Sequence, residues 1–258
     1  MQIKQINFSK FSSIKIGGIY DVYMLEDCAD YDDSFFIIGA SNNILLSPTP
    51  PPLMKLSKKF DYIKIIDDTL VVGGATPSGK INSFCKKHNI ADFEFLSHLP
   101  GTLGGIVYMN AGLKEFEIFN NLLSIKTCKG LQLKDDVDFG YRHTDINSPI
   151  LEARFKLTYG YDVEKVKIFK KMRENQPSDA SAGSCFKNPK GDYAGRLIEE
   201  VGLKGKRVGG MEFSKKHANF LVNIDNGTYK DAITLIEDAK LKVYEKFNIK
   251  LECEIKIL

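Results

Sequence analysis

Residues 100–112 are the part of this sequence that most restricts how the chain can fold. Gly101, Gly104, Gly105 and Gly112 lie there, separated mostly by apolar residues. Glycine lets the backbone turn tightly and approach a ligand closely, and backbone N–H groups in such a turn can bind an anion. The spacing matches neither the GxGxxG fingerprint of a dinucleotide-binding βαβ unit nor the phosphate-binding P-loop. The segment is therefore either a packed turn between strands or a glycine loop that holds an anionic group.

Strands and helices are mixed along the chain without a clean βαβ repeat, which predicts an α+β fold. We expect Thr76 to cap a helix that starts at Pro77 and buries Ile81, Phe84 and Cys85. Thr228 and Asp231 form a capping-box-like start to the last helix. The other expected helices are 163–174 and 193–201, and the expected strands are 35–38, 62–66, 70–74, 150–157, 251–258 and one around Ile125.

The proline-rich run Ser47–Pro52 is the only biased segment and predicts a stiff, extended linker. It separates a first segment, residues 1–52, from a second segment, residues 53–160. A third segment, residues 161–258, begins close to Asp162. The sequence therefore predicts three consecutive parts.

Charge and hydropathy exclude several functional classes. The net charge of +3 over 258 residues is too small, and the lysines are too dispersed, for a nucleic-acid-binding surface. No apolar run approaches the roughly 20 residues that span a membrane, and the N-terminus lacks the apolar core of a signal peptide. We therefore expect a cytoplasmic protein with neither a membrane nor a nucleic acid as partner.

The cysteines and histidines suggest no metal site. The five cysteines are widely scattered and none forms a CxxC pair, so neither a disulfide framework nor a zinc site is predicted. Reduced thiols are the expectation for a cytosolic protein. The four histidines show no metal-ligand spacing.

A polar cluster follows the small residues 181–183. Ser184, Lys187 and Asn188 bring a hydroxyl, an ammonium and an amide within a few positions of each other. A hydroxyl can donate a proton, and the other two groups can bind a polar or anionic ligand. Alone, such a cluster is more often a solvated turn, so its meaning depends on the rest of the chain.

Several motifs together resemble the UDP-N-acetylenolpyruvoylglucosamine reductase (MurB) family. Residues 100–112 resemble that family's flavin-pyrophosphate loop, residues 39–45 are similar to its first FAD loop, and residues 11–18 resemble its opening strand. The segments 184–189, 194–199, 202–205 and 214–220 follow in the family's order. The resemblance extends from residue 8 to residue 258, with departures at Ser41, Asn42 and His98.

The resemblance implies a two-subdomain FAD-binding fold of the vanillyl-alcohol-oxidase type over residues 1–52 and 53–160. Residues 161–258 would form a C-terminal α+β substrate-binding domain. The short chain resembles the compact subtype, which lacks a substrate-capping insertion. Non-covalent FAD would be bound by two loops: Gly39, Ala40, Ser41, Asn42, Asn43 and Ile44, and Pro100, Gly101, Thr102, Gly104, Gly105, Asn110, Ala111 and Gly112.

The reaction implied by the resemblance is that of UDP-N-acetylmuramate dehydrogenase. NADPH would reduce UDP-N-acetylglucosamine enolpyruvate to UDP-N-acetylmuramate for peptidoglycan synthesis. Hydride addition to the vinyl carbon leaves negative charge on the adjacent carbon, so the site needs a group that stabilises this charge and a proton donor. By resemblance, Arg142 and Glu254 would stabilise the enolate and Ser184 would donate the proton.

Six further side chains are expected to bind the UDP-sugar: Tyr141, Lys187, Asn188, His217, Asn219 and Lys256. The only expected partners are UDP-N-acetylglucosamine enolpyruvate and NADPH, and we expect a monomer. Two alternatives remain open. One is an FAD oxidase with the same fold and another substrate. The other is a flavin-free UDP-sugar-binding module, supported by the departures in the flavin loops.

Overall fold

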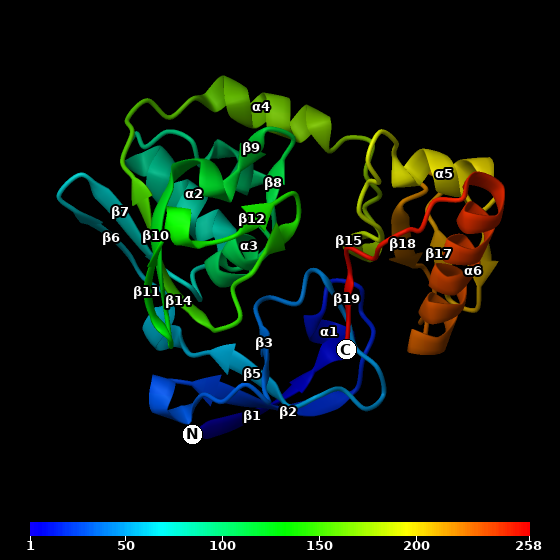
Figure 1. The fold of residues 1–258 in the computed structure, drawn as a ribbon, viewed down its shortest axis with the longest axis horizontal. Helices are drawn as coiled ribbons and strands as arrows, with labels where there is room; N and C mark the ends of the chain where they lie inside the picture. Colours follow the sequence, from blue (N-terminus) through cyan, green and yellow to red (C-terminus); the bar gives the residue numbers. More distant parts are fainter. The chain divides into compact units, whose positions relative to one another are not determined.

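The computed structural model describes residues 1–258, which form two compact units that interleave along the chain (Figure 1). The first unit comprises residues 1–4, 22–40 and 52–174, and the second comprises residues 5–21, 41–51 and 175–258. The glycine loop that begins at Gly39 is thus shared between the units. The division into residues 1–52, 53–160 and 161–258, which we expected from the sequence, stays a prediction.

Short strands dominate the chain, and α6 is its longest helix. The helices are α1 (Phe8–Phe11), α2 (Ser78–Lys87), α3 (Leu103–Tyr108), α4 (Val163–Met172), α5 (Ala194–Glu200) and α6 (Tyr229–Phe247). The strands up to residue 117 are β1 (Gln2–Asn7), β2 (Ile19–Leu25), β3 (Phe36–Ile38), β4 (Ile44–Leu45), β5 (Leu53–Leu56), β6 (Ile63–Ile66), β7 (Thr69–Gly73), β8 (Gly112–Leu113) and β9 (Phe116–Glu117). The later strands are β10 (Leu122–Thr127), β11 (Gly130–Leu133), β12 (Phe139–Gly140), β13 (His143–Thr144), β14 (Ile150–Lys156), β15 (Ala180–Ser184), β16 (Arg207–Val208), β17 (Met211–Phe213), β18 (Phe220–Asn223) and β19 (Lys256–Ile257).

An antiparallel sheet with the strand order β11-β10-β14-β7-β6 forms the centre of the first unit. Helices α2 and α3 share one buried apolar cluster with this sheet, to which Ile81, Ile106 and Phe155 belong. The expected strands 62–66 and 70–74 form β6 and β7, which pair as an antiparallel hairpin. Its turn contains Asp67 with φ +49°, a conformation that aspartate tolerates well.

A second sheet contains the strands β1-β2-β5-β3 in that order. Strand β5 pairs in parallel with β2 on one side and with β3 on the other, and Ile38 lies opposite Lys55. Parallel pairing brings the same ends of β3 and β5 together. The loop that follows β3, which begins at Gly39, therefore starts beside Lys55.

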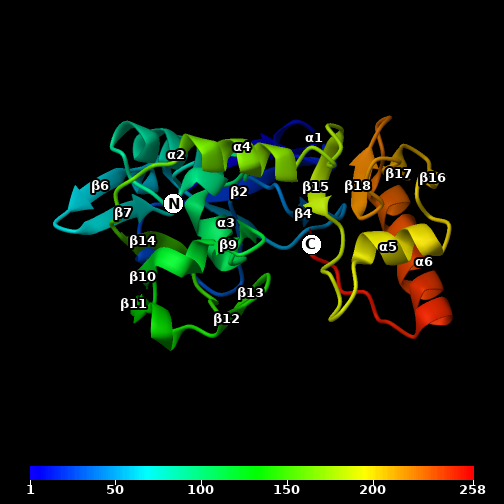
Figure 2. The same ribbon diagram turned by 90° about the horizontal axis from the view of Figure 1, so that it is seen from above.

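The second unit is built on an antiparallel sheet with the order β15-β18-β17-β16. Helix α6 runs beside this sheet, with α5 against it (Figure 2). The predicted capping box is confirmed: the N–H of Asp231 donates to Thr228 Oγ1 at 3.2 Å, and the N–H of Thr228 donates to Asp231 Oδ2 at 3.0 Å. Two backbone donors at the helix start are thereby satisfied.

Three local expectations from the sequence are wrong. Helix α2 begins at Ser78, one residue later than expected, because the Thr76 hydroxyl donates to the carbonyl of Tyr62 at 3.1 Å and does not cap the helix. Residues 11–18 form no strand, since helix α1 ends at Phe11 and Lys15 has φ +59°. The glycine segment 100–112 contains a short helix, α3, and is not loop throughout.

The C-terminal strand is also shorter than expected. Only Lys256–Ile257 form β19, which pairs in parallel with β4, and Cys253 makes an isolated bridge to Phe186. Leu251 and Ile255 are buried, whereas Glu252 is exposed.

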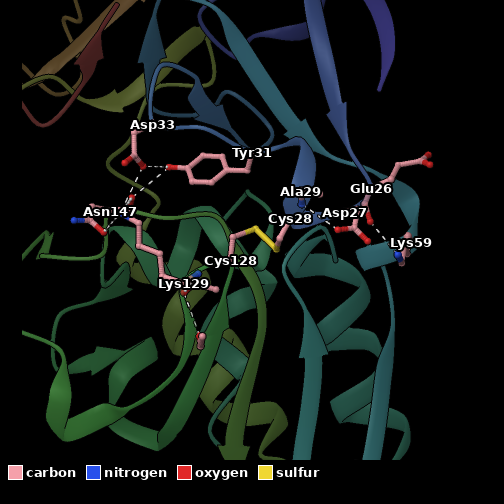
Figure 3. Close-up of a disulfide and its surroundings, with 12 residues drawn as sticks. Glu26, Asp27, Cys28, Ala29, Tyr31, Asp33, Lys59, Cys128, Lys129 and Asn147 are labelled. Carbon is pink, nitrogen blue, oxygen red and sulfur yellow. Dashed lines mark hydrogen bonds and ion pairs between the residues drawn. A yellow bond between two sulfur atoms is a disulfide. The ribbon is translucent and has the colours of Figure 1, made fainter.

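The expectation of wholly reduced cysteines is wrong as well. Cys28 and Cys128 form a disulfide in the first unit, with their Cα atoms 5.2 Å apart (Figure 3). They are 100 residues apart in the sequence, so no spacing rule could pair them. Cys85 and Cys185 are buried free thiols, and Cys253 is half-buried. None of the helices is long and apolar enough to span a membrane.

Candidate active site

A cavity of about 390 Å³ lies within the first unit, and its volume falls in the usual range of ligand pockets. Four of the residues predicted to bind FAD line it: Gly39, Thr102, Gly104 and Gly105. Thr102 immediately precedes α3, and the two later glycines lie in its first turn. The structure therefore brings parts of both predicted flavin loops to one cavity.

Close backbone contacts explain why glycine is required around this cavity. A Cβ atom at Gly39 would lie 2.6 Å from Thr102 Oγ1, and one at Gly74 would lie 1.9 Å from the carbonyl oxygen of Ile150. Real Cβ atoms do not approach other atoms this closely, so a larger residue would push the cavity walls apart.

Lys55 lines the cavity and was not predicted from the sequence. Its ammonium donates a hydrogen bond of 2.6 Å to the carbonyl oxygen of Gly39. Burial lowers the pKa of Lys55 below its usual value, because a charged ammonium is poorly solvated there. A lysine inside the otherwise apolar run Leu53–Leu56 was the available signal. The other lining residues that sequence reasoning missed include Tyr31, Asp33, Lys129, Asn147 and Ser148.

Two hydroxyls near the predicted flavin loops are buried and make no hydrogen bond within the protein. Ser148 Oγ belongs to a residue of the cavity wall, and Ser41 Oγ lies in the 39–44 loop, in the second unit. Unpaired buried polar atoms are rare in native proteins, and an unpaired atom in a cavity wall is a candidate ligand contact. Ser41 also has φ +54°, a conformation that glycine adopts more readily.

Arg142 lies in the first unit, in the turn between β12 and β13, with φ +55°. Its guanidinium donates to the carbonyl oxygen of Gly112 at 3.1 Å and lies 5.1 Å from the ring centre of Tyr141. Tyr141 is 49% exposed. The turn is fixed to α3 because the Thr144 hydroxyl donates to the Tyr108 carbonyl at 2.7 Å.

Asn110 organises the surroundings of Arg142. Its side-chain amide donates to Glu117 Oε2 at 2.8 Å and to the carbonyl oxygen of Gly140 at 3.1 Å. Its side-chain oxygen accepts the N–H of Phe119 at 3.3 Å. The side chain is fully buried and bonded to its own unit, so in this structure it supports the Arg142 turn.

Ser184 ends strand β15 in the second unit. The pairing with β18 shifts register between Ser181 and Ser184, and Gly183 has φ +79°, so the strand is irregular directly before Ser184. An irregularity of this kind re-aims the side chains that follow it. The N–H of Glu254 donates to the carbonyl oxygen of Cys185 at 2.9 Å. Two of the three predicted catalytic residues therefore lie on neighbouring segments.

The second half of the first predicted flavin loop meets the same segment. The Asn43 side chain donates to the carbonyl oxygen of Glu254 at 2.9 Å, and the N–H of Lys256 donates to the carbonyl oxygen of Asn43 at 3.0 Å. Ile44 pairs with Lys256 in the β4–β19 ladder. The remaining predicted cofactor residues lie in the connections around these elements: Ala40, Asn42, Pro100, Gly101 and Ala111.

Asn219 is buried and fixes the backbone two residues beyond Ser184. Its side-chain oxygen accepts the N–H of Phe186 at 3.0 Å, and its amide donates to the Phe186 carbonyl at 2.8 Å. His217 is close in sequence, and its Nδ1 accepts the N–H of Asn219 at 3.3 Å. Burial lowers the pKa of His217, with a smaller contribution from Lys204. Both residues were predicted to bind substrate; in the structure Asn219 supports the backbone beyond Ser184, and His217 bonds to Asn219.

The remaining predicted substrate residues lie in the same unit. Lys187 forms an ion pair of 2.7 Å with Glu252, which ties the Ser184 segment to the chain terminus a second time. Asn188 Oδ1 accepts the N–H of Ala194 at 3.0 Å, at the start of α5. The second unit thus gathers Lys187, Asn188, His217, Asn219 and Lys256 around the segments of Ser184 and Glu254, whereas Tyr141 and Arg142 belong to the first unit.

Comparisons with known proteins agree with one another. Residues 176–258 match the family model for the C-terminal domain of UDP-N-acetylenolpyruvoylglucosamine reductase. A reductase of that name from Campylobacter jejuni is 47% identical over 98% of this chain and 99% of its own length. One from Helicobacter hepaticus is 45% identical over the full length of both chains.

A solved structure supports the same assignment. The crystal structure of the reductase (MurB) from Thermus caldophilus superposes with a TM-score of 0.86 at 26% identity, over 100% of this chain and 99% of that one. The predicted α+β fold class is confirmed by this likeness and by the elements of the structure. The motif order, the fold and the relatives lead to one conclusion: this chain belongs to the UDP-N-acetylenolpyruvoylglucosamine reductase (MurB) family.

Proposed function

We propose that this protein reduces UDP-N-acetylglucosamine enolpyruvate to UDP-N-acetylmuramate, with FAD as bound cofactor and NADPH as reductant, in peptidoglycan precursor synthesis. The observation that carries the proposal is the 47% identity to a reductase of this name over 98% of the chain. Because the chains are this similar, each residue of the site can be assigned to a step that this reaction requires.

The lining of the cavity in the first unit supports binding of part of a dinucleotide such as FAD. Gly39, Gly104 and Gly105 let backbone atoms approach a ligand closely, and the buried Ser148 hydroxyl supplies a polar atom without a partner in the protein. Lys55 and Lys129 add two cations to a wall whose only lining carboxylate is Asp33. Positive charge in such a wall suits a diphosphate.

The chemistry that FAD supplies there is hydride transfer, from the nicotinamide of NADPH to the vinyl carbon of the enolpyruvyl ether. The protein must then stabilise the negative charge left on the carbon next to the carboxylate. Arg142 suits this role, because its planar guanidinium can bind an oxyanion through two N–H groups and is held by Gly112 and the Tyr141 ring. Glu254 assists by orienting and polarising the substrate carboxylate.

Ser184 donates the proton that completes the reduction. A serine hydroxyl is a weak acid, so it transfers its proton only when it is held against a strongly basic carbon. The rigid surroundings support this role: Asn219 bonds both backbone groups of Phe186, and the Cys185 carbonyl accepts the N–H of Glu254. Such support limits the movement of the Ser184 backbone.

The UDP-sugar needs cations and hydrogen-bond donors. Lys187, Lys256 and Asn188 supply these groups, and Tyr141 offers an exposed ring and hydroxyl. Asn219 contributes in another way, because both ends of its side-chain amide are already bonded to Phe186. We therefore assign Asn219 to supporting the site, and Lys187 to the phosphates as a point charge.

A visible spectrum of the purified protein tests the proposal. We expect flavin absorbance that NADPH bleaches under anaerobic conditions and that UDP-N-acetylglucosamine enolpyruvate then restores, with UDP-N-acetylmuramate as product. A flavin that is reoxidised by oxygen and never by this substrate would indicate an oxidase. A protein that binds no flavin after reconstitution with FAD would contradict the proposal.

A further inference from the structure

The Cys28–Cys128 disulfide joins two segments that also form part of the cavity wall. Cys28 begins the short 3-10 helix η1 (Cys28–Asp30), and Cys128 lies in the turn between β10 and β11. Tyr31 and Asp33 follow the first cysteine, and Lys129 follows the second (Figure 3). All three line the cavity. The disulfide thus ties together two parts of one wall.

Apart from the disulfide, polar contacts join these segments to the cavity-lining residue Asn147 and to each other. The Tyr31 hydroxyl donates to Asp33 Oδ1 at 2.9 Å and to the Asn147 carbonyl at 3.4 Å. Lys129 Nζ donates to Asn147 Oδ1 at 3.0 Å and lies 3.5 Å from Asp33 Oδ1 (Figure 3). The Lys129 side chain is 48% exposed and that of Asp33 73% exposed, so this ion pair contributes little in water. The covalent bond is therefore the strongest link across this wall.

The disulfide can be reached by a reagent, whereas two of the free thiols cannot. Cys28 and Cys128 are both partly exposed. Cys85 and Cys185 are fully buried, and burial raises the pKa of each thiol, which leaves them unreactive. A reagent for thiols or disulfides should therefore act on the Cys28–Cys128 pair and on Cys253.

We propose that Cys28–Cys128 is a redox-modification site whose exchange partner is a dithiol reductant, and that its state sets how tightly the neighbouring cavity retains its ligand. With the bond formed, Tyr31 and Lys129 are held in the wall. With the bond reduced, η1 and the β10–β11 turn keep the polar contacts and their packing against the apolar cluster around Leu25 and Met54, but no covalent link, and the wall opens more often. The identity of the ligand as flavin rests on the proposed function.

The thiol–disulfide exchange conserves electrons, protons and sulfur–sulfur bonds. One thiolate of the dithiol attacks the sulfur of one cysteine, forms a mixed disulfide and releases the other cysteine as a thiolate, which takes up a proton. The second sulfur of the dithiol then displaces the first cysteine, which is protonated in turn. Two electrons and two protons pass from the dithiol to the protein, and the dithiol becomes a cyclic disulfide.

The test measures ligand retention in the two redox states. The holoprotein is prepared without reductant or after incubation with dithiothreitol, and alkylation followed by mass spectrometry counts the free thiols. Release of flavin on dilution is followed by its fluorescence. We expect at least a fivefold faster release after reduction. The double variant Cys28→Ser/Cys128→Ser should release flavin at the reduced rate, with or without dithiothreitol, and Cys253→Ser should behave like the wild type.

Two outcomes would overturn the proposal: equal release rates in the two states, or alkylation of both cysteines in protein that was never reduced.

A second readout does not depend on flavin. Hydrogen exchange of residues 29–35 and 129–132 in ligand-free protein should accelerate on reduction in the wild type and not in the double variant. If the protein bound no flavin, the proposed function would fail, and unchanged exchange would still overturn this inference separately.

Discussion

The backbone N–H of Glu254 donates to the carbonyl oxygen of Cys185 at 2.9 Å, so the C-terminal segment is fixed directly beside the residue that follows Ser184. Asn43 strengthens this junction by donating to the carbonyl oxygen of Glu254. Residues from three distant parts of the sequence thus meet in one unit. Under the proposed function, this junction holds the proton donor and a carboxylate that acts on the same substrate.

Glu254→Gln tests the role of that carboxylate. The amide keeps the size of the side chain and removes its charge, so we expect reduction by NADPH to be unchanged and reoxidation by substrate to slow by about 10²-fold. Stopped-flow spectroscopy separates the two half-reactions. Glu252→Gln is the matched control two residues earlier. Its side chain is 72% exposed, and its loss should change the limiting reoxidation rate by less than about twofold.

Gly74→Ala should damage the cavity. The added methyl group would lie 1.9 Å from the Ile150 carbonyl oxygen, so β7 and β14 would have to separate. We expect a loss of about 1–3 kcal/mol in the free energy of unfolding and weaker flavin binding. Gly79→Ala in α2 is the control, because a Cβ atom there meets nothing within 4 Å. It should leave flavin binding intact and raise stability by up to about 1 kcal/mol. Urea unfolding and flavin titration measure both effects, and identical behaviour of the two variants would contradict the account.

Asn219→Ala should destabilise the second unit. The substitution leaves the N–H and the carbonyl of Phe186 buried without their side-chain partner. Each such group costs about 1–3 kcal/mol, so we expect a clearly lower midpoint in thermal unfolding. A normal melting temperature combined with a raised KM for the UDP-sugar would instead make Asn219 a direct substrate ligand.

Stability should decrease below neutral pH. Burial is the largest cause of the lowered pKa of both His98 and His217, so the folded state favours the neutral imidazole in each. This contribution is complete above the unfolded pKa of about 6.5 and is lost as the pH falls through the lower folded value. Chemical denaturation between pH 7.5 and 5 should show the decline, and His98→Gln/His217→Gln should flatten it. An equally steep decline in the double variant would assign the effect to other groups.

The sequence predicted regular elements well where a local signal was strong. The Thr228–Asp231 capping box and the strands β6 and β7 formed as expected, because a cap and a short strand pair with a tight turn depend on residues close in sequence. Thr76 misled because a tertiary contact with Tyr62 took its hydroxyl. The Cys28–Cys128 bond and the place of Lys55 in the cavity depend on contacts between distant segments, which no local pattern encodes.

The predictions for the site were likewise limited by contacts between residues that are distant in sequence. The resemblance in motif order implied catalytic roles for Ser184 and Glu254, and the structure adds that their segments touch within one unit. For Asn110 and Asn219 the resemblance implied ligand contacts, which stay predictions, and the structure adds that both amides bond to neighbouring backbone groups. A polar side chain in a motif has the same appearance in sequence whether it contacts a ligand or supports a neighbour that does.

The central claim is that Ser184 donates the proton in the second half-reaction. Its most direct test is the anaerobic reoxidation of NADPH-reduced Ser184→Ala by UDP-N-acetylglucosamine enolpyruvate, followed by stopped-flow absorbance beside Ser181→Ala from the same strand. We predict normal reduction by NADPH in both variants, a normal reoxidation rate in Ser181→Ala, and reoxidation slower by about 10²–10⁴-fold in Ser184→Ala. Reoxidation of Ser184→Ala at the wild-type rate, or loss of both half-reactions together, would contradict the claim.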